Sequence, residues 1–304
     1  NDLRLALGYE QINLYGVSYG TRLGLTLMRD YPSTLRSAVL DSVYPPQENL
    51  YTGLAPNAER SFNLLFKRCD ANPDCSKSYP DLRGVFYSLV DQLNASPVEV
   101  TVNAGGIKRT ARLDGGLLID VLFVGMYNPL VTARMPEMIY AIRQGEYALL
   151  RERLSLYFDP STALGMNMAV QCAEEIPFGQ VEDAYSAARS VQAQIAAFYP
   201  ASVAPLFKVC QTWYPDPPDP RENQPVSSEV PALLLSGELD PITPPEWAKG
   251  TAAALRNSYF YVIPGSGHWV TRSSACALQM ALAFWQDPSR APDLTNGCGI
   301  PLRQ

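Results

Sequence analysis

The chain has 304 residues, of which 47% are hydrophobic and 18% charged, a composition typical of an ordered globular protein. Its 24 basic and 30 acidic residues give a formal net charge of −6, without runs of like charge, which argues against nucleic acid as a partner. No apolar stretch reaches the roughly 18 residues that a membrane-spanning helix needs, since Asp120 interrupts the longest one, residues 117–126.

The first 46 residues predict two strands on either side of a helix. A short helical pattern over residues 2–7 leads into a strand at 11–15 and the sequence Gly-Val-Ser-Tyr-Gly at 16–20. A helix follows at 21–31, where Pro32 stops it, and a second, buried strand is predicted at 37–43.

Residues 47–230 have a different character and predict a mainly helical insertion. An extended pair, residues 98–102 and 110–113 around Gly105-Gly106, interrupts the helical pattern, and a proline-rich stretch at 214–231 predicts a stiff linker. Helical periodicity is found at residues 58–67, 82–94, 115–124, 135–144, 146–157 and 182–198.

Strand and helix patterns alternate again after Pro231. Strands are predicted at 232–236 and 258–263, and helices at 245–255 and 275–285. Alternation of this kind indicates a parallel sheet. We therefore predict an α/β fold with a core from residues 1–46 and 231–304 and a helical cap from residues 47–230.

Ser18 lies in a Gly-x-Ser-x-Gly sequence between a predicted strand and a predicted helix. That context is what a nucleophile elbow requires, because the sharp turn exposes the serine hydroxyl. The backbone N–H of Tyr19 and the start of the helix would then stabilise an oxyanion. An ordinary strand–helix turn that contains serine is the alternative.

A serine hydroxyl needs a base, and His268 is the sole histidine of the chain. It follows a predicted strand in a glycine-rich loop. Asp240, after the preceding strand, is the predicted acid that orients the imidazole; Glu238 lies two residues earlier and is the less favoured candidate. The order Ser, Asp, His is that of the α/β-hydrolases. The mechanism of such a triad requires no metal or cofactor.

The six cysteines favour disulfides over zinc ligands, because the chain has no Cys-x-x-Cys pair and one histidine. Disulfides would indicate an oxidising compartment, so we expect a secreted, periplasmic or cell-envelope protein. Buried thiols in a cytosolic enzyme are the alternative. The cysteines are Cys69, Cys75, Cys172, Cys210, Cys276 and Cys298.

The chain resembles the α/β-hydrolase peptidases of the proline iminopeptidase and tripeptidyl aminopeptidase group over nearly its whole length. The triad segments at residues 12–21, 233–245 and 265–268 carry the resemblance, and the segments at 169–175 and 210–213 are more specific to this group. The resemblance implies hydrolysis of peptides near a free N-terminus, with a cap that selects the substrate.

Two further expectations come from this resemblance. Glu174, and next Glu175, match the acidic residues that hold the substrate's α-ammonium group, a sensible pairing of charges. Surface or cap-stabilising charges are the alternative. The cysteines would pair in sequence order, as Cys69–Cys75, Cys172–Cys210 and Cys276–Cys298.

The chain departs from the group before Ser18. Members carry N-terminal strands and a Gly-rich loop that supplies a second oxyanion donor, and 17 residues are too few for these. We expect an upstream segment of the same protein, without which the Ser18 strand would be an exposed sheet edge and the chain impaired or prone to aggregate. Two alternatives stay open: an esterase with the same triad, and an inert fragment.

Overall fold

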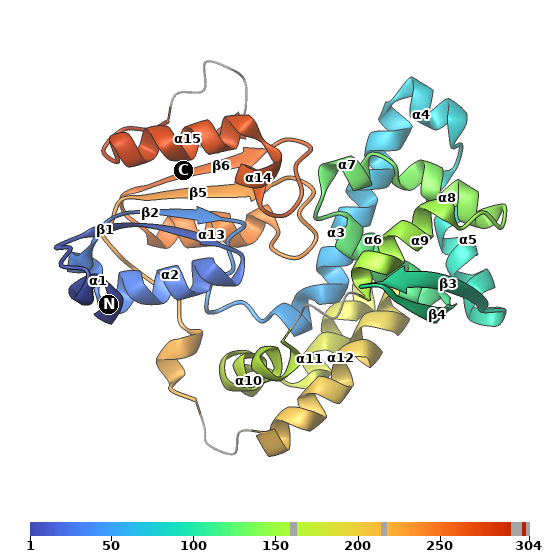
Figure 1. Cartoon of the computed structure of the whole chain (residues 1–304), viewed down its shortest axis with the longest axis horizontal. Coiled ribbons are helices and arrows are strands. Elements are labelled where there is room, and N and C mark those ends of the chain that lie inside the picture. The colour runs from blue at the N-terminus through green and yellow to red at the C-terminus, as the bar shows by residue number, and fades with distance from the viewer. Residues whose placement is uncertain (159–162, 214–217, 293–299, 302–304) are drawn as a thin grey trace. The chain divides into compact units, whose positions relative to one another are not determined.

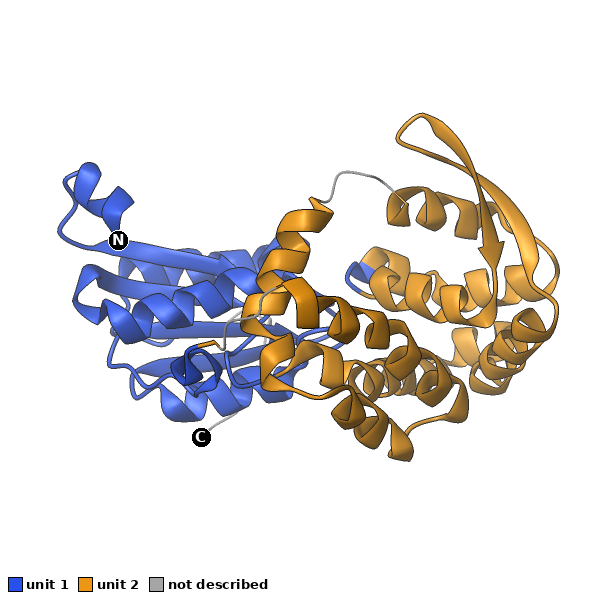
Figure 2. Ribbon diagram, turned by 90° about the horizontal axis from the view of Figure 1, so that it is seen from below, with its two compact units in different colours: residues 1–48, 127–129, 219–304 blue, residues 49–126, 130–218 orange. Residues whose placement is uncertain are grey.

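The chain folds into two compact units. The structure, a computed structural model, describes residues 1–158, 163–213, 218–292 and 300–301. Unit 1 comprises residues 1–48, 127–129 and 219–304, and unit 2 comprises residues 49–126 and 130–218 (Figure 2). The division into hydrolase core and cap at residues 46 and 230 stays a prediction.

A five-stranded sheet lies at the centre of unit 1, with strand order β1-β2-β5-β6-β7 (Figure 1). The first four strands are parallel, and β7 pairs antiparallel with β6. Parallel strands share one edge for their carboxyl ends, so the residues that follow β1, β2, β5 and β6 are brought together there. The strands are β1 Ile12–Val17, β2 Leu35–Asp41, β5 Ala232–Gly237, β6 Ser258–Ile263 and β7 Ile300–Pro301.

Burial along the strands follows their place in the sheet. Every residue of β5 is buried, as expected of a central parallel strand covered on both faces. In residues 12–15 of β1, partly buried and exposed residues alternate, and Tyr15 is 42% exposed. Among the described residues β1 is therefore an edge strand, as the sequence predicted.

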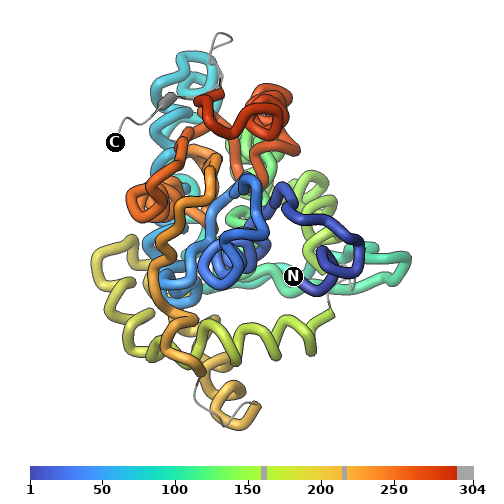
Figure 3. Tube along the Cα trace, turned by 90° about the vertical axis from the view of Figure 1, so that its left-hand side faces the viewer, coloured from blue at the N-terminus to red at the C-terminus, as the bar shows by residue number. Residues whose placement is uncertain are grey.

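Helices cover both faces of this sheet. Leu25 of α2 and Ala248 of α13 pack with Leu40 and Leu234 on one face, while Phe284 of α15 belongs to the cluster on the other. Figure 3 shows the blue α2 trace and the red α15 trace on opposite sides of the strands. The helices of unit 1 are α1 Asp2–Ala6, α2 Tyr19–Asp30, η1 Pro32–Thr34, η4 Pro220–Asn223, α13 Pro245–Ala254, α14 Val270–Ser273 and α15 Ala275–Gln286.

Unit 2 is mainly helical and contains one hairpin. Strands β3 Val98–Ala104 and β4 Ile107–Leu113 pair antiparallel, and the positive φ angles of Gly105 and Gly106 form the turn, as predicted. The helices are α3 Leu50–Ala71, α4 Pro73–Ser78, α5 Leu82–Ala95, α6 Gly115–Gly125, α7 Pro129–Thr132, α8 Met135–Arg143, α9 Ala148–Tyr157, α10 Leu164–Glu174, η2 Ile176–Phe178, α11 Val181–Ala187, η3 Ala188–Ser190 and α12 Ala193–Trp213.

The single helix predicted over residues 182–198 is wrong. The chain forms α11 and η3, becomes extended at Val191, and starts the 21-residue helix α12 at Ala193. α12 continues through Pro200 and Pro205, each of which costs the helix a backbone hydrogen bond. Tertiary packing outweighs that cost here, since Phe207 lies in a buried cluster of unit 2.

Two of the disulfides implied by the resemblance are present within unit 2. Cys69–Cys75 joins the end of α3 to α4, and Cys172–Cys210 joins α10 to α12, with Cα–Cα distances of 5.1 and 4.9 Å. Cys276 is disulfide-bonded, and Cys298, its expected partner, lies outside the described residues. Among the described residues, none forms a helix long and apolar enough to cross a membrane.

Candidate active site

Ser18 occupies a sharp turn between β1 and α2. Its φ of 56° and ψ of −125° are strained for a residue with a side chain, as expected of a nucleophile elbow. A Cβ on Gly16 would lie 2.5 Å from the carbonyl oxygen of Gly20, so the turn requires glycine at position 16. Thr21 closes it by donating its N–H and its hydroxyl to the Ser18 carbonyl oxygen, at 2.8 and 2.6 Å.

The imidazole of His268 is hydrogen-bonded to the carboxylate of Asp240. The distance from Nδ1 to Oδ2 is 2.8 Å, the His268 side chain is 9% exposed, and that of Asp240 is fully buried. The two residues follow neighbouring parallel strands, β6 and β5, at the carboxyl edge of the sheet. This pairing leaves Nε2 as the ring nitrogen available to take a proton from a hydroxyl.

Thr243, which the sequence reading did not single out, fixes the Asp240 carboxylate. Its hydroxyl donates to Oδ2 at 2.7 Å and lies 3.2 Å from His268 Nδ1, while its N–H and that of Ile242 donate to Oδ1, each at 3.0 Å. Glu238, the less favoured acid, instead accepts a hydrogen bond from the Gly265 N–H at 2.8 Å and stabilises the turn before His268.

Charge within the pair shifts both pKa values in the direction that favours an ion pair. Burial alone would lower the pKa of His268, but the carboxylates of Asp240 and Asp41 outweigh it and hold that pKa above its usual 6.5. Burial would raise the pKa of Asp240, yet the imidazole and the Thr243 donors hold it below its usual value. The aspartate therefore stays ionised and stabilises an imidazolium.

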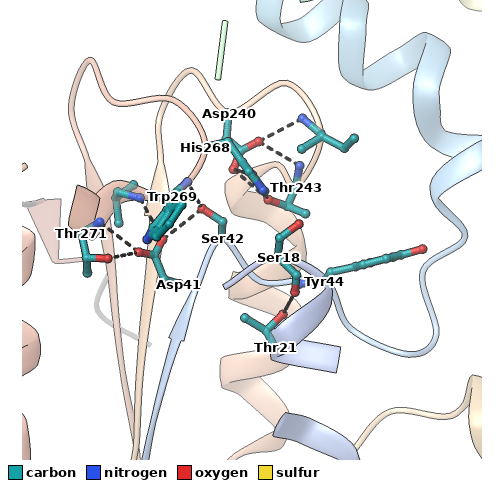
Figure 4. A network of polar contacts seen from close by, with 12 residues as sticks. Ser18, Thr21, Asp41, Ser42, Tyr44, Asp240, Thr243, His268, Trp269 and Thr271 are labelled. Carbon is teal, nitrogen blue, oxygen red and sulfur yellow. Dashed lines mark hydrogen bonds and ion pairs between the residues drawn. The ribbon is translucent and has the colours of Figure 1, made fainter. Parts of the chain in front are cut away.

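Figure 4 shows the Ser18 side chain on the same side of the site as the His268–Asp240 pair, with its hydroxyl directed toward them. Tyr127 adds a ring contact to His268, with centroids 4.8 Å apart. Its segment, residues 127–129, clusters with unit 1, although the chain on either side of it belongs to unit 2. The sequence reading missed Tyr127, because no local pattern links it to a histidine 141 positions further on.

The two predicted ammonium-binding glutamates have different surroundings in unit 2. Glu175 is 3% exposed, and its carboxylate accepts from the Leu50 N–H at 3.0 Å, at the start of α3. Its carbonyl oxygen accepts from the Asn49 side chain at 2.8 Å. Glu174 is partly buried at the end of α10. The contacts of Glu175 indicate a role in holding α3, whereas Glu174 stays the first candidate for a substrate amine.

Among the described residues, no three His, Cys, Asp or Glu side chains lie close enough together to hold a metal ion. Tyr19, the predicted oxyanion donor, is the first residue of the 12-residue helix α2, whose N-terminal dipole favours a developing negative charge. The chemistry that these groups can support is acyl transfer through a serine.

A parallel sheet, a nucleophile elbow after β1 and a histidine after β6 define an α/β-hydrolase. Residues 1–146 match the family model described as the alpha/beta hydrolase fold, and residues 196–296 match the one described as TAP-like protein. The chain therefore has the α/β-hydrolase fold, and its residues 196–296 are similar to the TAP-like proteins.

The chain is similar to the serine protease Hip1 of Mycobacterium tuberculosis and of Mycobacterium bovis, at 25% identity over 307 residues. The match covers 93% of this chain and 57% of the relative, so the chain spans little more than half the length of these proteins.

Similar solved structures include an α/β hydrolase from a Medee basin deep-sea metagenome library and a thermophilic esterase from Thermogutta terrifontis. The first has 14% identity and a TM-score of 0.41, and the match covers 94% of this chain and 69% of that one. The second has 17% identity and a TM-score of 0.37, with 93% and 68% covered.

Proposed function

We propose that the protein is a serine hydrolase that works through an acyl-enzyme. Ser18 Oγ attacks the substrate carbonyl, and His268 Nε2 takes the hydroxyl proton and then gives it to the leaving group. Water then attacks the acyl carbon while His268 takes its proton; the bond from that carbon to Ser18 Oγ breaks, the imidazolium returns the proton to Oγ, and the acyl group leaves as a carboxylic acid. Asp240 stays ionised and holds the imidazolium. The observation that carries this proposal is the 2.8 Å bond between His268 and Asp240 at the sheet edge where Ser18 lies.

Covalent labelling tests this mechanism directly. A fluorophosphonate probe, applied to the protein in its natural full-length form, should add one phosphonyl group at Ser18, identified by intact mass and peptide mapping. Ser18→Ala should abolish labelling, and His268→Ala should slow it by several orders of magnitude, because the hydroxyl loses its base. A folded protein that does not label, or labels at another serine, would refute the proposed mechanism.

The substrate we propose is a peptide with a free N-terminus, cleaved by exopeptidase action. The TAP-like match over residues 196–296 and the similarity to a serine protease support this class. Glu174 would bind the substrate's α-ammonium through a charge-assisted hydrogen bond.

Two disulfides support an oxidising location, so we further propose a secreted, periplasmic or cell-envelope protein.

Paired substrates separate this proposal from an esterase. Glu174→Ala should lower kcat/KM for a free-amine peptide by about 10- to 100-fold, the equivalent of one charged hydrogen bond. It should leave turnover of an N-acetylated peptide or a small ester unchanged. Glu182→Ala is the matched control, because Glu182 is an exposed acid in the first turn of α11. Equal losses on all substrates would remove Glu174 from substrate recognition and favour the esterase.

A further inference from the structure

A second buried carboxylate, Asp41, lies at the same sheet edge as the catalytic pair. It is the last residue of β2 and is fully buried, and each of its oxygens accepts two hydrogen bonds (Figure 4). Oδ1 accepts from the Ser42 hydroxyl at 3.0 Å and the Val270 N–H at 2.9 Å. Oδ2 accepts from the N–H and the hydroxyl of Thr271, at 2.9 and 2.6 Å. These four donors favour the ionised form of the Asp41 carboxyl, against the effect of burial, which raises its pKa.

Three of these donors belong to the turn that directly follows His268. Trp269 has a φ of 64°, in the left-handed region that costs a residue with a side chain roughly 1–2 kcal/mol. Its N–H donates to the Ser42 hydroxyl oxygen at 2.8 Å, and the next two N–H groups donate to Asp41. Asp41 and Ser42 thus bind three consecutive backbone N–H groups and stabilise the strained turn.

A chain of hydrogen bonds ties the same carboxylate to the strand that carries Ser18. Trp269 Nε1 can only donate, and it does so to the Tyr15 hydroxyl oxygen at 2.9 Å. The Tyr15 hydroxyl then donates to Thr271 Oγ1 at 2.5 Å, and Thr271 donates to Asp41. Tyr15 is in β1, three residues before Ser18. The nucleophile strand and the histidine loop are thereby linked through one buried charge.

We propose that Asp41 is a positioning residue for the reaction. Its carboxylate holds the Trp269–Thr271 backbone and so fixes the place of the imidazole relative to the Ser18 hydroxyl. Asp240 orients the ring through Nδ1, whereas Asp41 secures the main chain from which the ring projects. The inference rests on the proposed serine-hydrolase function, and it assigns Asp41 no contact with the substrate.

The charge of Asp41 also acts on the imidazole. Together with Asp240 it raises the pKa of His268, and burial raises the pKa of Asp41 itself while its four donors oppose that rise. Loss of the Asp41 charge should therefore move the acidic limb of the pH profile to lower pH, an effect that lost packing alone would not produce. The other titratable or charged groups around this network are Tyr15, Tyr127, Asp240 and Arg272.

The experiment measures the rate of fluorophosphonate labelling at Ser18 against pH. Asp41→Asn should lower the maximal rate by about 10- to 100-fold, as expected for a catalytic group displaced by up to an ångström, and should shift the acidic limb downward. Asp287→Asn is the matched control, because Asp287 is an exposed aspartate that accepts from Ser289. It should change neither quantity.

Ser42→Ala provides a second variant that retains the charge. It removes the acceptor of the Trp269 N–H, so it should slow labelling several-fold and leave the acidic limb in place. If Asp41→Asn does not fold, this variant alone tests whether the contacts to the Trp269–Thr271 backbone position His268. If the variants fold and have the labelling rate and the acidic limb of the wild type, the inference about Asp41 is wrong. The proposed triad would still stand in that case, because it depends on labelling of the wild-type protein at Ser18. Absence of labelling in the wild type would instead refute the proposed function.

Discussion

The backbone of the histidine loop packs directly on Gly237, the last residue of β5. A Cβ at this position would lie 1.9 Å from the carbonyl oxygen of Gly267 and 2.6 Å from that of Ser266. Both atoms are main-chain atoms of the loop that presents His268, so no side-chain rotation can relieve the overlap. Gly237→Ala is therefore expected to displace the histidine loop rather than to leave it in place.

The size of that displacement follows from the overlap. Real Cβ contacts essentially never fall below 3.0 Å, so the Gly267 oxygen must move from 1.9 Å by about 1 Å or more. Misplacement of a catalytic group by an ångström costs roughly 100-fold in rate. Overpacking at a buried position also costs about 1–3 kcal/mol of the free energy of unfolding.

Two measurements on the purified variants check both effects. The second-order rate of fluorophosphonate labelling at Ser18 should fall by about 100-fold in Gly237→Ala, and urea unfolding should show the loss of stability. Gly250→Ala is the matched control, because a Cβ there meets nothing within 4 Å inside α13. It should label at the wild-type rate and gain about 0.5–1 kcal/mol from the lower entropy of the unfolded chain.

The result that would refute this reasoning is a folded Gly237→Ala variant that labels at the wild-type rate. It would mean that the loop can move by an ångström without loss of the productive geometry between His268 and Ser18. If Gly250→Ala also labelled slowly, a glycine replacement that does not contact the histidine loop would disturb the site as well. The slow labelling of Gly237→Ala could then not be assigned to its overlap with that loop.

Three further predictions concern charge, capping and cross-linking. Asp240→Asn should lower the maximal rate of labelling at Ser18 by about 10⁴-fold. The neutral imidazole is the base, and the substitution removes a charge that raises the pKa of His268, so the acidic limb of the pH–rate profile should also move to lower pH. An acidic limb at or above the wild-type position would contradict this. Glu175→Gln should lower the free energy of unfolding by about 1–2 kcal/mol, because the carboxylate binds an N–H at the start of α3; an unchanged urea midpoint would exclude that role. Replacement of both Cys172 and Cys210 by alanine opens a loop closed over 38 residues and should cost about 4 kcal/mol in urea unfolding, and a loss below 1 kcal/mol would indicate that the unfolded chain is already compact there.

Much of unit 1 could be predicted because its signals are local. Apolar runs identified the central strands, as in the fully buried β5, and the Gly-x-Ser-x-Gly sequence identified the turn at Ser18. The order of strands then placed Asp240 and His268 at neighbouring carboxyl ends of the sheet. Their 2.8 Å hydrogen bond agrees with that expectation, since parallel pairing of β5 and β6 fixes the distance between the loops.

Features that depend on distant partners could not be predicted. In the sequence, Asp41 only interrupts the apolar pattern of a strand, and its partners Val270 and Thr271 lie 229 and 230 positions away. α12 continues through Pro200 and Pro205 because packing in unit 2 outweighs local propensity. Periodicity reports which face of an element is buried, and it carries no information about the residue that will meet a particular carboxylate.

In the mechanism proposed above, the two buried aspartates at the sheet edge have complementary roles. A ring held by Asp240 alone could still move with its loop, because a single hydrogen bond to Nδ1 fixes orientation and leaves the backbone position open. A turn held by Asp41 alone would leave the imidazole free to rotate about its side-chain torsions. Since Trp269 is strained, the backbone needs its own anchor, and a buried carboxylate that accepts four hydrogen bonds provides one.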